Sequence, residues 1–165
     1  MKMLERLLGH DLASTRELLL ICLSLSDEQM DREFDIGWRT LRKTFDHMIF
    51  NIEVWTDLMR ERPVREEDTR VSSQGLLERL EQSYAEFADF AKRIEAEDKL
   101  DALWLDVLDH PPALKSYGGA IGHLITHNMH HRAELQHILH RLGVEPVPEG
   151  DLMGWDQRMR YPSNP

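Results

Sequence analysis

Apolar residues recur at steps of three and four over four long stretches of this chain, which is the period of an amphipathic helix. Each stretch therefore has one apolar face that must be buried against another element. The pattern predicts an all-α fold in which four helices pack as a four-helix bundle. The four stretches run from Met3 to about Cys22, from Trp38 to about Arg60, from Ser72 or Ser73 to about Glu97, and from Tyr117 to about Leu142.

The links between the stretches are polar and contain few apolar residues. Two prolines forbid a continuous helix over residues 98–116, so a small hairpin or an irregular link is expected before the fourth helix. A short helical turn is expected after Ser26 and a short helix after Glu149. We find no internal repeat, and we interpret residues 1–165 as a single domain, long enough to bury a core without disulfide bonds.

Charge and hydropathy favour a protein that acts on a small-molecule substrate. The chain has 20 basic and 30 acidic residues, a formal charge of −10, and no basic cluster, which argues against a nucleic-acid partner. No apolar run approaches the ~20 residues that cross a bilayer, which argues against a membrane protein. Cys22 is the only cysteine and the first residues do not resemble a secretion signal, so we expect a cytoplasmic location.

Three histidines have the spacing of metal ligands. His127 and His131 stand four residues apart on one flank of the fourth helix, and His47 lies on the matching flank of the second helix. Three imidazoles leave a coordination position open, as in catalytic zinc sites. Spacing alone leaves two interpretations open, a metal site and a group of ordinary packing histidines.

Other polar residues near these histidines allow more than one interpretation. Glu134 lies on the same flank as His131 and either orients that imidazole and moves a proton or is a solvated partner of nearby charges. Asn51, one turn after His47, has the same two interpretations. His123 is either a fourth ligand or, as we favour, an exposed residue beside the site. The remaining histidines are expected to be ordinary polar residues or to point away from the core, namely His10, His110, His130, His137 and His140.

Two polar residues fall near the centre of the apolar stripe of the fourth helix. Asn128 and Arg132 would need either buried partners or a subunit interface there. Together with Phe50 they suggest a homodimer. Cys22 lies among leucines without a basic neighbour, so it is interpreted as an inert core thiol.

Two segments resemble the DinB family, the damage-inducible and YfiT-like group of metal-binding four-helix bundles. They are residues 41–55, which contain His47, and residues 123–135, which contain His127 and His131. The resemblance implies an up-down-down-up bundle, often a homodimer, and a divalent ion, nickel or zinc, held by these three histidines. Where the family often has His-His-Arg-Gly-Gln, this chain has Glu134 in place of the glutamine.

The resemblance also bears on activity. Family members include thiol S-transferases and isomerases that use low-molecular-weight thiols such as bacillithiol or mycothiol. We therefore expect a divalent-metal-dependent enzyme, a thiol S-transferase or a related transferase or hydrolase. The alternatives are a non-catalytic metal-binding stress-response protein and a partner-binding helical module. A pocket beside the metal would favour the enzyme.

Overall fold

The computed structural model describes residues 1–161, which are mostly helical and include one small antiparallel sheet. This agrees with the all-α prediction, and the sheet is a hairpin, one of the two alternatives expected between residues 98 and 116. The helices are α1 (Met3–Cys22), α2 (Asp27–Met30), α3 (Leu41–Met59), α4 (Ser73–Ala96), α5 (Tyr117–Arg141) and α6 (Leu152–Arg160), and the strands are β1 (Leu103–Asp106) and β2 (Ala113–Ser116).

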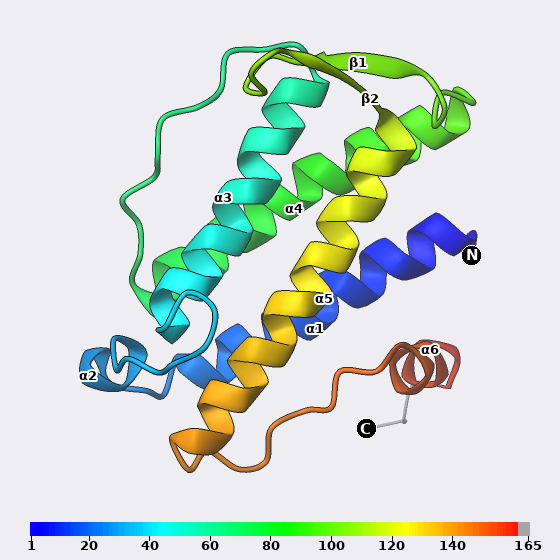
Figure 1. Cartoon of the computed structure of the whole chain (residues 1–165). Helices are drawn as coiled ribbons and strands as arrows, with labels where there is room; N and C mark the ends of the chain where they lie inside the picture. Colours follow the sequence, from blue (N-terminus) through cyan, green and yellow to red (C-terminus); the bar gives the residue numbers. More distant parts are fainter. Residues whose placement is uncertain (162–165) are drawn as a thin grey trace.

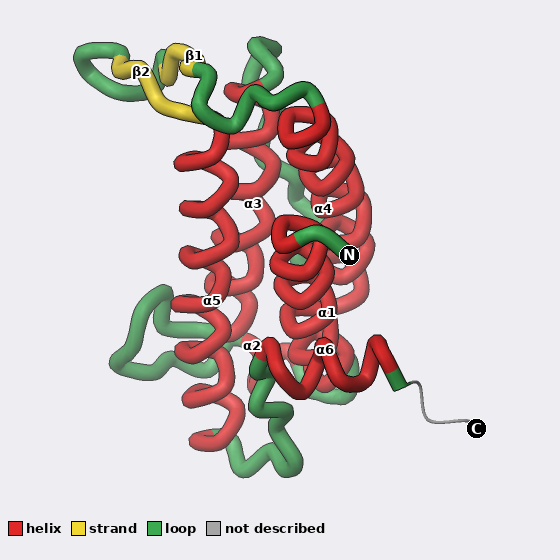
Figure 2. The backbone as a smooth tube through the Cα atoms, turned by 90° about the vertical axis from the view of Figure 1, so that its right-hand side faces the viewer, coloured by secondary structure: helices red, strands yellow, loops and turns green. Residues whose placement is uncertain are grey.

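The four long helices pack side by side around one apolar core. α1 contacts α4 and α5, and α3 contacts the same two helices (Figure 1 and Figure 2). Each helix directs its apolar stripe inward, and Leu19, Phe45, Leu80 and Leu124 are examples of fully buried side chains, one from each helix. The arrangement places α3 next to α5, although the two helices are far apart in the sequence.

Helix α3 begins three residues later than the sequence pattern predicted. The predicted start was Trp38, but the helix begins at Leu41, and the Oγ1 atom of Thr40 caps it by accepting a hydrogen bond from the Lys43 amide at 3.1 Å. Gly37 and Arg39 have φ values of +45° and +72°, which a right-handed helix excludes. Trp38 therefore belongs to a folded connector that precedes the helix.

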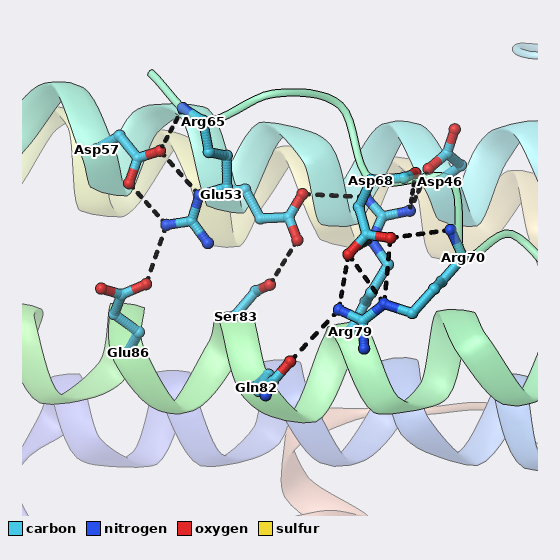
Figure 3. A network of polar contacts seen from close by, with 10 residues as sticks. All are labelled: Asp46, Glu53, Asp57, Arg65, Asp68, Arg70, Arg79, Gln82, Ser83 and Glu86. Carbon is cyan, nitrogen blue, oxygen red and sulfur yellow. Dashed lines mark hydrogen bonds and ion pairs between the residues drawn. The ribbon is translucent and has the colours of Figure 1, made fainter. Parts of the chain in front are cut away.

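A buried ion pair fixes α3 against α4 (Figure 3). The guanidinium of Arg79 on α4 is fully buried and donates to Glu53 at 3.0 Å and to Asp46 at 2.7 Å, both on α3. Ser83 donates to the other oxygen of Glu53 at 2.8 Å. Arg79 also donates to the carbonyl oxygen of Asp68, at 3.3 Å, which ties the α3–α4 connector to the same network. The helix that carries His47 is thus held in place by buried charge as well as by apolar packing.

The two polar residues in the α5 stripe find their partners within the chain. Asn128 donates to Oδ2 of the fully buried Asp11 on α1 at 2.8 Å, and Arg132 forms an ion pair with Oδ1 of the same carboxylate. Tyr84 from α4 donates to Asp11 at 2.9 Å. A structural salt bridge is therefore the correct interpretation of Arg132, and neither Asn128 nor Arg132 any longer gives a reason to expect a subunit interface.

The hairpin and α6 cover opposite parts of the helices. Leu105 pairs with Leu114 in the antiparallel register, and the hairpin lies across the ends of α3 and α5 (Figure 1). α6 packs on α1 through Trp155, and a Cβ atom on Gly9 would lie 2.8 Å from that indole. Within residues 1–161, no helix is both long and apolar enough to cross a membrane.

Candidate metal centre

The neighbouring helices α3 and α5 bring the three predicted histidines together. Nε2 of His127 lies 3.3 Å from Nε2 of His47 and 3.1 Å from Nε2 of His131. All three rings therefore direct the same ring nitrogen toward one point, and these atoms form a group that could hold a metal ion. The i, i+4 spacing on α5 supplies two of the nitrogens, and the packing of α3 on α5 supplies the third.

The hydrogen bonds of the rings leave lone pairs at this point. Nδ1 of His131 lies 2.7 Å from Oε2 of Glu134, and since a carboxylate only accepts, Nδ1 carries the proton and Nε2 is free to bind a metal. Nδ1 of His127 is buried and has no hydrogen-bond partner within the described residues. The Asn51 amide nitrogen lies 2.9 Å from Nε2 of His47 and would have to give up that contact when an ion binds.

The distances between the nitrogens suit a divalent transition metal. Metal–nitrogen bonds of about 2.0–2.1 Å at a tetrahedral angle place two ligating nitrogens roughly 3.3 Å apart. The two observed separations, 3.1 and 3.3 Å, lie close to this value. Neutral imidazole is a ligand that suits zinc and nickel alike. The donor set therefore fits one ion of this class and does not distinguish between the two metals.

Burial keeps two of the rings neutral near pH 7. It lowers the pKa of His47 and of His127 from 6.5 to about 4. A metal binds the neutral ring, so protons do not compete at these two ligands under neutral conditions.

Two residues next to the site were not recognised as part of it from the sequence. The indole of Trp38 stacks on the imidazole of His47, with ring centroids 4.3 Å apart, and Gly37 packs directly against the Glu134 carboxylate. The connector before α3 thus covers the site on this side. The only signal was a glycine and a tryptophan just before Thr40, and the prediction placed Gly37 in a connector and Trp38 at the start of the helix.

The other histidines lie outside the cluster. His123 is exposed, as favoured, and its ring centroid lies 5.5 Å from that of His127. His130 is also exposed, and its Nε2 contacts Oε1 of Glu134 at 3.2 Å, an i, i+4 contact along α5. His10 was expected to be an ordinary polar residue, but it is buried and donates to the carbonyl of Gly150 at 2.7 Å. His110, His137 and His140 are exposed.

Fold and site together define a helical protein with a histidine cluster that could hold a metal ion. The sequence profile of the DinB superfamily matches residues 11–135, which is most of the chain and includes all three histidines and Glu134. The chain therefore belongs to the DinB superfamily. A search of curated proteins found no match.

Proposed function

We propose that this protein is a divalent-metal-dependent enzyme that transfers a low-molecular-weight thiol to a small electrophile, or carries out a related transfer or hydrolysis. The observation that carries the proposal is the convergence of three Nε2 atoms, from His47, His127 and His131, with no protein carboxylate among them. Three neutral ligands leave the full charge of zinc or nickel available to a substrate at an open position.

When bound, the ion would lower the pKa of a thiol or a water molecule at that open position. Glu134 accepts the Nδ1 proton of His131, so it fixes the orientation of this ring and raises its basicity. Trp38 stacks on His47 and covers one face of this ring. Asn51, one turn along α3, directs its amide toward the same point and can donate to a bound substrate.

The nucleophilic thiol of this reaction has to come from outside the protein. Cys22 is the only cysteine of the chain and is fully buried. Burial raises the pKa of its thiol to about 12, so it does not form a thiolate near neutral pH. This supports a reaction that uses a separate small thiol as co-substrate.

The proposal extends to the arrangement of helices and subunits. We propose an up-down-down-up four-helix bundle, supported by the packing of α1 and of α3 against both α4 and α5 and by the helix directions in Figure 1. We also propose a homodimer, which now rests on the family resemblance alone, because Phe50 is partly buried against the core of its own chain. Sedimentation at micromolar concentration should give the mass of two chains, and a single species of 19.4 kDa would contradict it.

Metal analysis of protein purified without a histidine tag tests the ligand assignment. We expect one divalent ion per chain in the wild type and a large loss of bound metal in His131→Ala. His137→Ala is the matched control, because His137 is an exposed histidine on the same helix. Full metal occupancy in His131→Ala would refute the assignment.

Rate measurements with small thiols and model electrophiles test the activity. The metal-loaded protein should accelerate transfer, and Glu134→Gln should slow it by about 10-fold while retaining the metal, the low end of the range for a residue that orients a ligand. Equal rates for metal-free and metal-loaded protein would contradict the enzyme and favour the non-catalytic metal-binding protein.

A further inference from the structure

A hollow of about 340 Å³ lies one to two helical turns from the histidine cluster, between α3, α5 and the hairpin. His123 precedes His127 by four residues on α5, about 6 Å along the helix axis, and Trp55 follows His47 by eight residues on α3, about 12 Å along that axis. The hollow is lined by Trp55, Lys115, Ser116, Gly119, Ala120 and His123.

Two aromatic side chains, Trp55 and His123, form part of the wall of this hollow. The rings of Trp55 and His123 lie 5.1 Å apart at an angle of 33°, close to parallel. The His123 ring also lies 5.5 Å from that of His127, so the aromatic wall continues to a proposed metal ligand. Such surfaces favour the flat face of another π system over a saturated group of the same size.

The one cation among the lining residues of the hollow is already paired with carboxylates. The ammonium group of Lys115 lies 2.5 Å from Asp106 and 3.0 Å from Asp109, and 4.9 Å from the centre of the Trp55 ring. This ammonium group is therefore not free to pair with an anionic ligand, and the two carboxylates, which outnumber it, disfavour an anion further. An uncharged planar group is the ligand that these surroundings favour.

We propose that this hollow binds an aromatic ring of the substrate while the reacting sulfur or oxygen atom, joined to the ring by a short chain, lies at the histidine cluster. This inference rests on the proposed function and names its substrate class. The size is suitable, since a cavity of about 150 Å³ holds a benzene molecule, and the larger hollow has room for a substituted ring.

Two thiols that differ only in the planarity of the ring test the proposal. In cobalt-loaded protein, sulfur-to-metal absorption reports the binding of 2-phenylethanethiol and of 2-cyclohexylethanethiol. We expect the phenyl compound to bind about 5-fold more tightly, from the usual strength of an aromatic pair. Trp55→Leu and His123→Leu should remove this preference, Trp55→Phe should retain it, and His137→Leu, a control on the same helix, should not change it. Equal binding of the two thiols by the wild type would overturn the proposal.

A ring without sulfur separates the hollow from the metal chemistry. Indole added to metal-free and metal-loaded protein should shift the NMR signal of the Trp55 indole N–H, assigned with Trp55→Phe. If indole shifts this signal but neither thiol produces sulfur-to-cobalt absorption, the result supports the aromatic hollow and contradicts the thiol chemistry. If indole leaves the Trp55 signal unchanged while the thiols bind the metal, the proposed function stands and the aromatic hollow is wrong.

Discussion

The carboxylate of Glu134 lies between two histidines of α5 and the backbone of Gly37. It accepts from Nδ1 of His131 and contacts His130, and a Cβ atom at position 37 would overlap it. The φ angle of Gly37 is +45°, a region in which residues with a side chain are strained. A residue without a side chain is therefore needed at this position to keep the carboxylate on His131.

Gly37→Ala should displace Glu134 and weaken metal binding. Loss of a residue that orients a metal ligand costs about 10- to 100-fold in affinity, so we expect a change of this size in a titration against a competing chelator. Gly122→Ala on α5 is the control, because its added Cβ atom would meet no other atom within 4 Å. Similar metal affinities for the two variants would show that Gly37 does not position the carboxylate.

The stability of the metal-free protein should depend on pH through His47 and His127. In the unfolded chain these rings bind protons below about pH 6.5, whereas in the folded chain they do so only near pH 4. Protons therefore favour the unfolded chain between these values. The stabilising contribution of the two neutral rings to the free energy of unfolding is complete above pH 6.5 and is lost as the pH falls toward 4. Urea unfolding at several pH values should show a smaller decline in His127→Gln than in the wild type. An identical decline in both would contradict this origin.

The three histidines could be predicted from the local sequence pattern, whereas the residues that contact the site and the core could not. The helical period places His127 and His131 on one flank without knowledge of the rest of the fold. The contact of Trp38 with His47 depends on positive φ angles in a connector, and the ion pair of Arg132 with Asp11 joins residues 121 positions apart. Neither contact produces a local sequence pattern from which it could be predicted. The metal itself is still a prediction.

At the scale of elements, the buried ion pair between α3 and α4 positions the helix that carries His47. Arg79→Met would leave the buried carboxylate of Glu53 without its cation, which typically costs about 3–5 kcal/mol of unfolding free energy. Arg70→Met is the control, because Arg70 pairs with Asp68 at the surface and should cost less than about 1 kcal/mol. Chemical denaturation measures both.

The double variant Arg79→Met, Glu53→Gln distinguishes an unpaired charge from lost packing. It removes the buried charge together with its partner, so it should be more stable than Arg79→Met alone. If the double variant is the less stable of the two, packing of the arginine side chain rather than charge compensation accounts for the loss.

The apolar pattern predicted which stretches are helical more accurately than it predicted the residues at which the helices begin and end. The apolar period gave all four long helices, and the prolines gave the hairpin region. The start of α3 was wrong by three residues, because the apolar pattern continues through Trp38 while the backbone turns at Gly37 and Arg39. Which helices lie next to one another is a property of the whole core, and no single stretch encodes it.

At the scale of the whole molecule, the proposed metal would join two helices that the chain connects only through α4 and the hairpin. His47 lies on α3, and His127 and His131 lie on α5, so an ion at this point binds the folded protein and has no preformed site in the unfolded chain. Zinc at 100 times its dissociation constant should then stabilise the wild type by about 2.7 kcal/mol, or roughly 5–10 °C in Tm. His131→Ala should lose most of this shift, whereas His137→Ala should keep it. A zinc-dependent rise of equal size in both variants would mean that the ion binds elsewhere, because only one of the two histidines contributes a nitrogen to the cluster between α3 and α5.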